Sequence, residues 1–329
     1  MGPHPAVAEI RRAVRAALTG STGTVLVACS GGADSLALAA ATAFEAPRHG
    51  VRAGLVTVDH GLQPGSAGRA ARVAAVGYEL GFDPVTTVPV TVGRAGGPEA
   101  AARAARYGAL DAAAEALGAR VLLGHTLDDQ AETVLLGLGR GSGPRSIAGM
   151  RAADGHYLRP LLGVRRSTTV AACTALGLEP WDDPHNADPA FQRVRLRREV
   201  LPLLEDVLQG GVAEALARTA ALLRDDLDAL DRIAATNSAE RATSDTSGRD
   251  RQLDVAVLVD LPRALRTRTL QTWTRHHRLG PLTSVHLDAL DVLVTDWHGQ
   301  GPLDLPGGRV ARASGKLVVQ PTPYRNPQE

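Results

Sequence analysis

Residues 24–35 read TVLVACSGGADS, an apolar run that ends in a glycine pair and a short polar stretch. The β-branched run is typical of a buried strand, here Thr24–Cys29, and the alanine-rich stretch Ser35–Phe44 is typical of a helix. Gly31 and Gly32 let the backbone turn tightly and point several N–H groups at one position. The pattern therefore predicts a phosphate-binding loop at a helix N-terminus, with an ordinary serine-capped strand–turn–helix connection as the alternative.

The loop contains a carboxylate, Asp34, which would repel a phosphate unless a cation stood between them. Magnesium commonly binds one or two carboxylates together with phosphate oxygens, so Asp34 is predicted to be a magnesium ligand. The sequence has no GxxxxGK[ST] loop, and Lys316 is its only lysine. Phosphates would therefore be held by backbone amides, arginine and metal.

Outward from this loop, the first half of the chain alternates β-branched runs with alanine-rich stretches, which predicts an α/β fold with a parallel, Rossmann-like sheet and helices on both faces. The further strands are expected at Gly54–Val58, Pro84–Val90 and Arg120–Gly124, and the helices at Ser66–Leu80, Pro98–Leu117 and Asp128–Leu138. Such sheets bind ligands outside the carboxyl ends of their strands. Polar clusters that follow three of the strands therefore predict one shared site: Ser30–Ser35, Asp59–His60 and His125–Asp129.

The second half of the chain is expected to be organised differently. We expect a catalytic domain at 1–205, a helical connector at 206–237 and a small α+β domain at 238–329. The polar stretch Asn237–Asp250 lacks apolar periodicity and is predicted to be a linker or loop. The small domain is expected to contain a short strand, two helices and a hairpin, with helices at Leu261–Arg278 and Ser284–Asp296 and turns at Gly307–Gly308 and Ser314–Gly315.

Composition excludes several classes of protein. The 329 residues carry a formal net charge of +1, and the two cysteines, Cys29 and Cys173, form no CxxC pair, which argues against a zinc site or a disulfide framework. No apolar run approaches the roughly 20 residues that span a bilayer. The N-terminal 18 residues lack the apolar core of a secretory signal and resemble an amphipathic helix, so we expect no membrane association and a cytoplasmic location.

A second group of carboxylates lies in residues 124–133, GHTLDDQAET. In a helix, the three-residue spacing of Asp129 and Glu132 places both carboxylates on one face. Two close carboxylates require a cation, either a metal or a substrate ammonium. The alternative is that these acids only complement the dipole of the first helical turn.

Both motifs resemble known families. The hexapeptide SGGADS resembles the SGGxDS motif of PP-loop ATP pyrophosphatases, which adenylate a substrate and release pyrophosphate. The stretch 124–133 resembles the GHxxDDQxET motif of tRNA(Ile)-lysidine synthetases, a narrower group. Further segments resemble that group in the same order across roughly residues 25–205, namely 59–62, 99–107, 141–150, 159–162 and 183–197. The sequence departs from the common pattern at Pro144, Ser146, Val194 and Gln63.

The resemblance implies an adenine nucleotide alpha hydrolase-like fold and a ligase activity. ATP would adenylate the anticodon cytidine (position 34) of tRNA-Ile(CAU), and L-lysine would then displace AMP to form lysidine. The implied catalytic residues are Asp34, His125, Asp129 and Glu132, of which Asp129 and Glu132 hold the lysine and Asp34 the Mg²⁺. The residues implied to bind ATP are Ser30, Gly31, Gly32, Ala33, Asp34, Ser35, Asp59, His60, Arg103 and Arg193.

The tRNA would need a wider basic surface than the ATP site. Its predicted members are Arg106, Arg197, Arg198 and Arg266, with the C-terminal domain as the tRNA-binding part of the chain. A solvated helix face in an arginine-rich protein is the alternative for Arg266. A homodimer is left open, and the rival functions are another PP-loop enzyme, such as a tRNA thiolase or an amidating synthetase, and a non-catalytic binding protein.

Overall fold

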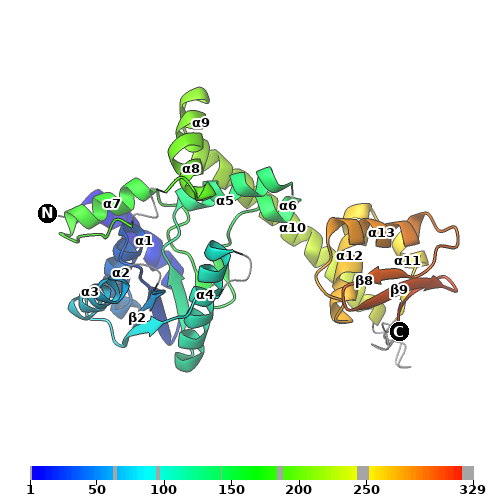
Figure 1. Ribbon diagram of the computed structural model, residues 1–329, viewed down its shortest axis with the longest axis horizontal. Helices are drawn as coiled ribbons and strands as arrows, with labels where there is room; N and C mark the ends of the chain where they lie inside the picture. The colour runs from blue at the N-terminus through cyan, green and yellow to red at the C-terminus, as the bar shows by residue number, and fades with distance from the viewer. Residues whose placement is uncertain are drawn as a thin grey trace. The chain divides into compact units, whose positions relative to one another are not determined.

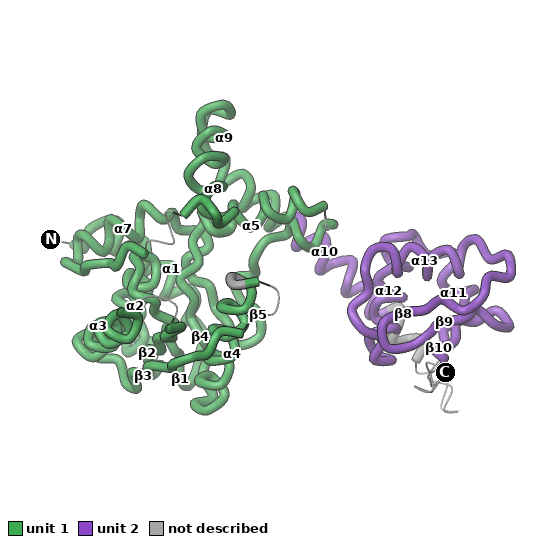
Figure 2. The backbone as a smooth tube through the Cα atoms, viewed as in Figure 1, with its two compact units in different colours: residues 1–222 green, residues 223–329 purple. Residues whose placement is uncertain are grey.

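The computed structural model describes residues 2–61, 65–93, 97–141, 143–183, 188–242 and 252–320. The chain divides into two compact units, residues 1–222 (unit 1) and 223–329 (unit 2) (Figure 2). The division falls inside one helix, α10 (Val212–Ala242). The expected domain limits at 205 and 237 stay predictions. Gln63 and the Pro184–Asn186 part of the last motif lie outside the described residues.

Unit 1 contains a six-stranded sheet in the order β3-β2-β1-β4-β6-β5. Its strands are β1 (Thr24–Ala28), β2 (Arg52–Asp59), β3 (Val85–Pro89), β4 (Arg120–Leu123), β5 (Ala153–Asp154) and β6 (Tyr157–Leu158). Every neighbouring pair is parallel except β5 and β6. From β1, the strands β2 and β3 are added on one side of the sheet, and β4 is then added on the other side of β1. This reversal is a topological switch point, the place where such sheets bind ligands.

Helices cover both faces of this sheet, as the sequence predicted (Figure 1). The helices α1 (Pro5–Leu18), α2 (Ala33–Glu45), α3 (Ser66–Glu79) and α7 (Arg166–Ala175) cover one face, and α4 (Pro98–Leu117) covers the other. Side chains alternate along a strand. Accordingly, Val25 and Val27 of β1 belong to the core under α1 and α2, whereas Leu26 packs in the core with Leu110 of α4.

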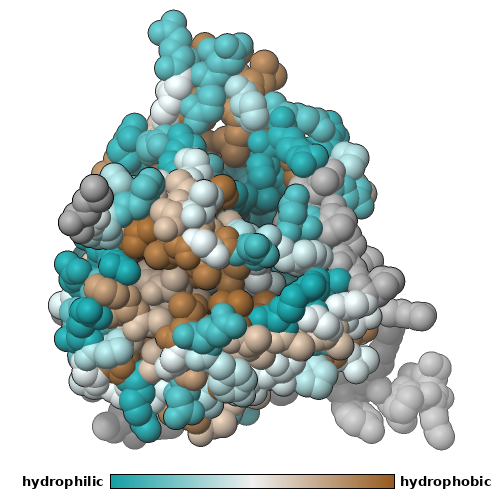
Figure 3. Space-filling view, turned by 90° about the vertical axis from the view of Figure 1, so that its left-hand side faces the viewer, coloured by the Kyte–Doolittle hydropathy of each residue, from teal (hydrophilic) through white to brown (hydrophobic). Residues whose placement is uncertain are grey.

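The remaining elements of unit 1 follow β4. They are α5 (Leu127–Arg140), α6 (Pro144–Ile147), α8 (Gln192–Arg195), a π-helical turn at Leu196–Val200 and α9 (Leu201–Val207). A short 3₁₀ turn at Pro47–His49 lies earlier in the chain, between α2 and β2. The predicted strands and helices of the first half are confirmed, with ends shifted by a few residues. Figure 3, turned to face unit 1, shows hydrophobic residues at the centre of this face with hydrophilic residues around them.

Unit 2 contains an antiparallel sheet in the order β7-β10-β9-β8. Its elements are β7 (Gln252–Asp254), α11 (Ala256–Val259), α12 (Arg263–His276), α13 (Ser284–Thr295), β8 (Leu303–Leu305), β9 (Gly308–Ala313) and β10 (Lys316–Gln320). Leu258, Leu270, Leu290 and Leu317 form the centre of its core. The predicted helices and the turn at Ser314–Gly315 are confirmed, whereas the other turn lies at Pro306–Gly307, one residue earlier than predicted, because Gly308 begins β9.

The predicted linker at Asn237–Asp250 is wrong in its first part, because residues 237–242 continue helix α10. Residues 243–250 lie outside the described residues. Across the described parts of both units, no helix is both long enough and apolar enough to cross a membrane.

Candidate active site

A cavity of about 850 Å³ opens at the carboxyl ends of β1, β2 and β4, where the switch point predicts a ligand. It brings the three predicted polar clusters together. The predicted site residues that line it are Ser30, Gly32, Ala33, Asp34, Ser35, Asp59, His60, Arg106, His125, Asp129, Arg197 and Arg198. Four other predicted residues do not line the cavity: Gly31, Arg103, Glu132 and Arg193. Glu132 nevertheless accepts a hydrogen bond from Arg197, which does line it.

The loop at residues 30–35 is held in shape by its own hydrogen bonds. The Ser35 hydroxyl donates to the Gly32 carbonyl at 2.9 Å, and the Ser30 amide donates to the Ser35 hydroxyl at 3.2 Å. Gly31 has φ +87°, and a Cβ there would lie 2.9 Å from Cγ2 of Val73. Helix α2 begins at Gly32 without a side-chain cap. The alternative of a serine-capped helix is therefore not observed, and the first N–H groups of α2 are left for a ligand.

The predicted carboxylates converge on arginine side chains. Nε of Arg166 donates to Oδ2 of Asp34 at 3.1 Å, and its Nη2 donates to Oδ1 of Asp129 at 2.6 Å. Glu132 is fully buried and accepts a hydrogen bond of 2.7 Å from Nε of Arg197. In the free protein, the cation that these carboxylates require is therefore supplied by arginine.

Burial and the arginines set the charges of these groups. Burial raises the pKa of Asp34, and Arg166 and Thr169 offset only part of that effect. Burial also raises the pKa of Glu132 despite its bond to Arg197. Burial alone would also raise the pKa of Asp129, but the charge of Arg166 and the hydrogen bond from the Thr126 amide outweigh burial. The pKa of Asp129 is therefore lowered. Asp129 is thus the member of the group that is most firmly ionised.

His125 lies beside Asp129 and is uncharged at neutral pH. Burial lowers the pKa of His125 to about 4, although the charge of Asp129 opposes the shift. Burial and the neighbouring Arg106 likewise lower the pKa of His60. A neutral imidazole has one acceptor nitrogen, so both rings offer an acceptor to a ligand.

Four buried nitrogen atoms around the cavity have no hydrogen-bond partner in the described structure: Nδ1 of His60, Nδ1 of His125, Nε of Arg106 and Nη1 of Arg166. Most buried polar groups in proteins are hydrogen-bonded, so each exception requires an explanation. A polar ligand in the cavity would provide the missing partners.

Two residues that the sequence analysis did not single out complete the site. Arg166 binds both Asp34 and Asp129, and the Thr169 hydroxyl donates to the other oxygen of Asp34. Arg166 and Asp34 are 132 positions apart, so no local pattern connects them. The one feature of the sequence that could have indicated Arg166 is its position, because the pair Arg165–Arg166 closely follows the RPLL segment at 159–162.

Three predicted arginines do not line the cavity. The structure corrects the prediction that Arg266 belongs to an exposed basic surface, because its side chain is buried in unit 2. There Nε of Arg266 donates to Asp291 at 2.6 Å and Nη1 donates to the Leu261 carbonyl at 2.7 Å. It is therefore not exposed to a polyanion. Arg103 donates to the Tyr107 hydroxyl, and Arg193 lies 3.9 Å from Glu132.

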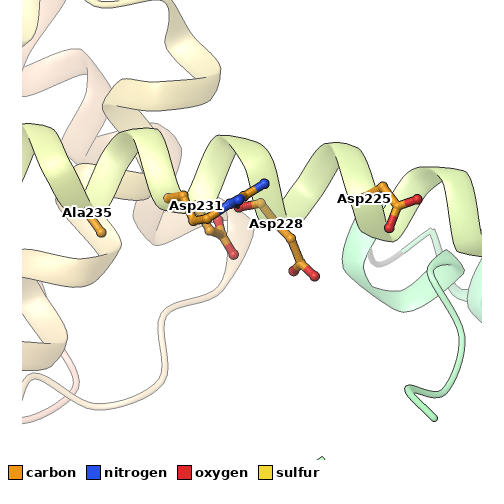
Figure 4. Close-up of a pocket in the computed structure, with 5 residues that line it drawn as sticks. Asp225, Asp228, Asp231 and Ala235 are labelled. Atoms are coloured by element: carbon orange, nitrogen blue, oxygen red, sulfur yellow. Dashed lines mark hydrogen bonds between the residues drawn. The ribbon is translucent and has the colours of Figure 1, made fainter. Parts of the chain in front are cut away.

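A second hollow lies in unit 2, along helix α10 (Figure 4). It is lined by Asp225, Asp228, Asp231, Arg232 and Ala235, and Asp231 accepts a hydrogen bond from Arg268. An acidic face on one helix is ordinarily solvated. The described residues contain no group of three or more His, Cys, Asp or Glu side chains able to hold a metal.

In comparisons with known proteins, one family model matches a range within unit 1 and another a range within unit 2. A PP-loop domain model matches residues 7–204, and a TilS substrate binding domain model matches residues 253–318. A tRNA(Ile)-lysidine synthase of Thermobifida fusca is 57% identical over 97% of this chain and 98% of that protein. Its counterpart in Streptomyces coelicolor is 54% identical, over 97% of this chain and 99% of that protein.

The solved structures support the fold. A U34-tRNA thiolase from Methanococcus maripaludis superimposes with a TM-score of 0.55 over 67% of this chain and 80% of that chain, at 20% identity. At that identity the likeness concerns the fold alone. The family models and the curated relatives go further: the chain belongs to the tRNA(Ile)-lysidine synthase family.

Proposed function

We propose that this protein is an ATP-dependent carbon–nitrogen ligase that joins L-lysine to the anticodon cytidine (position 34) of tRNA-Ile(CAU), forming lysidine, AMP and diphosphate. The observation that carries the proposal is the shared cavity. It is lined both by the phosphate loop at residues 30–35 and by the ionised carboxylate of Asp129. An anionic nucleotide and a cationic amine can therefore meet in one site.

In the first step, the C2 oxygen of cytosine attacks the α-phosphorus of ATP, and the bond to the departing diphosphate breaks. Negative charge grows on that diphosphate, so donors already in place lower the barrier. The free N–H groups at the start of α2, the Ser30 hydroxyl and Arg106 are among the donors that line the cavity.

Magnesium is proposed to enter with ATP rather than as a resident ion. Both oxygens of Asp34 already accept hydrogen bonds, from Thr169 and Arg166, and no three-ligand cluster exists among the described residues. Such a site fits an ion held mainly by phosphates and water with one protein carboxylate. When bound, Mg²⁺ neutralises phosphate charge, and Asp34 is the residue that would hold it.

In the second step, the ε-amine of lysine attacks C2, and the bond from C2 to the adenylate oxygen breaks, releasing AMP. Asp129 holds the incoming ammonium, with the buried Glu132 behind it. The amine must lose a proton before it attacks. With a pKa of about 4, His125 is neutral and is a hydrogen-bond acceptor for the amine, but it is a weak base at neutral pH.

The tRNA is proposed to contact both units. In unit 1, Arg197 and Arg198 line the cavity and belong to the arginine-rich segment that follows α8. In unit 2, the match of residues 253–318 to a substrate binding domain supports a role in holding the tRNA. We place the reaction in the cytoplasm, where its tRNA would be found, and a homodimer stays a prediction.

The test is ATP-dependent incorporation of radiolabelled lysine into tRNA transcripts. Purified protein, ATP and Mg²⁺ are incubated with tRNA-Ile(CAU) or with tRNA-Met(CAU), which carries the same anticodon. Labelling of the isoleucine transcript alone is the expected result. If a folded protein that binds ATP labels neither transcript, the proposal is wrong, and the other PP-loop chemistries become the better candidates.

A further inference from the structure

The cavity contains one arginine that serves three carboxylates at once. Arg166 lies 3.1 Å from Asp34, 2.6 Å from Asp129 and 3.9 Å from Glu132. The three acids come from two different helices, α2 and α5, and Arg166 opens a third, α7. The guanidinium thus occupies the position between the carboxylates where a substrate cation would bind.

We propose that Arg166 keeps lysine out of this position until ATP is bound, so that the two substrates bind in the order ATP, then lysine. The inference rests on the proposed function and adds the order of binding to it. It assigns Arg166, which the sequence motifs did not include, as a residue that senses ATP.

In the free protein, both oxygens of Asp129 already have partners. Its Oδ1 accepts from Arg166 and lies 3.6 Å from Arg197, and its Oδ2 accepts from the amide and the hydroxyl of Thr126, at 2.8 and 2.9 Å. A lysine ammonium can reach Asp129 only by displacing a guanidinium. Displacement without a new anion would break the shorter of the two hydrogen bonds of Arg166 to carboxylates, at 2.6 Å, and place a second cation beside this partly buried guanidinium, which is costly.

ATP would supply the new anion. Arg166 lines the same cavity as the phosphate loop, and its Nη1 makes no hydrogen bond. Arginine binds phosphate through two parallel N–H groups, a geometry that suits a triphosphate better than a divided contact with separate carboxylates. Once Arg166 turns to the phosphates, one oxygen of Asp129 is free for lysine.

The move of Arg166 from Asp129 to the phosphates requires only a side-chain rotation. The backbone N–H of Arg166 donates to Asp128 at 2.8 Å, which fixes the start of α7 to α5. The neighbouring Arg165 holds Glu214 at 2.6 Å and Glu205 at 3.2 Å, which fixes the same point to α9 and α10. The guanidinium of Arg166 can move while its backbone stays in place.

The experiment measures binding of radiolabelled lysine to the full-length protein by equilibrium dialysis, without tRNA. It is run with and without Mg²⁺ and α,β-methylene-ATP, which cannot be cleaved at the α-phosphorus. The inference predicts that lysine binds at least about tenfold more tightly when the analogue is present. Equal affinity in the two conditions would overturn the order of binding and leave the proposed function standing. No lysine binding in either condition, while the analogue binds, would contradict the lysine site itself and therefore both proposals.

Variants at Arg166 sharpen the result. Arg166→Ala exposes the carboxylates, so we expect it to bind lysine without the analogue, about tenfold more tightly than the wild type. Arg166→Lys keeps a cation at the position and should keep the dependence on the analogue. Arg195→Ala is the matched control, because this exposed arginine pairs with the exposed Glu199 one turn away and does not line the cavity, so its lysine binding should not change. A Lys variant that binds lysine independently of the analogue would contradict the inference even if Arg166→Ala does not fold.

Discussion

Two arginine–aspartate groups, a partly buried one in unit 1 and a buried one in unit 2, differ in how completely they are paired. In unit 2, Arg266 donates to both oxygens of Asp291, at 2.6 and 3.3 Å, and to the Leu261 carbonyl. In unit 1, Arg166 divides its donors between Asp34 and Asp129 and keeps one nitrogen without a hydrogen bond. The first arrangement stabilises a core. The second is incomplete, and an incomplete polar group beside a cavity is what a ligand completes.

The unit 1 group is supported by its surroundings. His60, His125 and Arg106 also present unpartnered nitrogens at the cavity. An unpartnered atom alone is weaker evidence, because Thr269 Oγ1 and Trp273 Nε1 in unit 2 also lack a hydrogen-bond partner. It is the combination with convergent carboxylates and a phosphate loop that distinguishes unit 1.

The largest effect is expected from Asp129→Asn in the incomplete group. The amide can still accept from Thr126, but it cannot hold an ammonium, so lysine-dependent turnover should fall by about 10³-fold while ATP binding survives. Lysine incorporation and binding of the ATP analogue measure the two parts. Asp206→Asn, an exposed residue of α9, is the matched control and should leave both unchanged. Unchanged turnover in Asp129→Asn would remove this carboxylate from the mechanism.

In the complete group, Arg266→Met should affect stability rather than activity. It removes both hydrogen bonds to the buried Asp291 and leaves it only the longer ion pair with Arg263, at 3.7 Å, so we expect the free energy of unfolding to fall by about 3 kcal/mol. Urea-induced unfolding followed by circular dichroism measures the change, and the double variant Arg266→Met/Asp291→Leu should recover most of it. If the single variant instead kept its stability but lost binding of tRNA-Ile(CAU), the original prediction for Arg266 would be correct after all.

The same two arginines show what the sequence could and could not predict. The strand–loop–helix at residues 24–45 follows from local patterns, a β-branched run, two glycines and an alanine-rich stretch, and the structure confirms it. Arg166 could not be found this way, because its role depends on contacts with residues far away in the sequence. Arg266 was misplaced although a signal existed: with Leu270 and Thr274 it recurs every fourth residue, which puts it on the buried face of α12.

A smaller effect, on stability against pH, is expected from His125. The pKa of about 4 in the folded protein lies below the ordinary 6.5, so between these values the unfolded chain binds a proton that the folded protein does not. The free energy of unfolding should therefore fall with falling pH, by about 2 kcal/mol between pH 7.5 and pH 5. The loss should be smaller by about this amount in His125→Asn, measured by urea unfolding at both pH values, because His60 still contributes a loss of the same sign. Equal losses in wild type and variant would show that His125 is not held neutral in the cavity.

The smallest effect is expected from Gly31→Ala, which tests whether the shape of the phosphate loop separates unit 1 from an ordinary core. At φ +87° an alanine is strained, and its Cβ would meet Val73 at 2.9 Å, so the loop must shift and ATP affinity should fall by about tenfold. Isothermal titration with the ATP analogue measures this loss. Gly50→Ala, at φ +66° with no atom within 4 Å of its Cβ, has the same backbone strain outside the cavity and should bind the analogue normally. Adding Val73→Ala to the Gly31 variant removes the collision but not the strain. Partial recovery would show that contact with α3 fixes the loop, whereas no recovery would assign the whole effect to the left-handed backbone at Gly31.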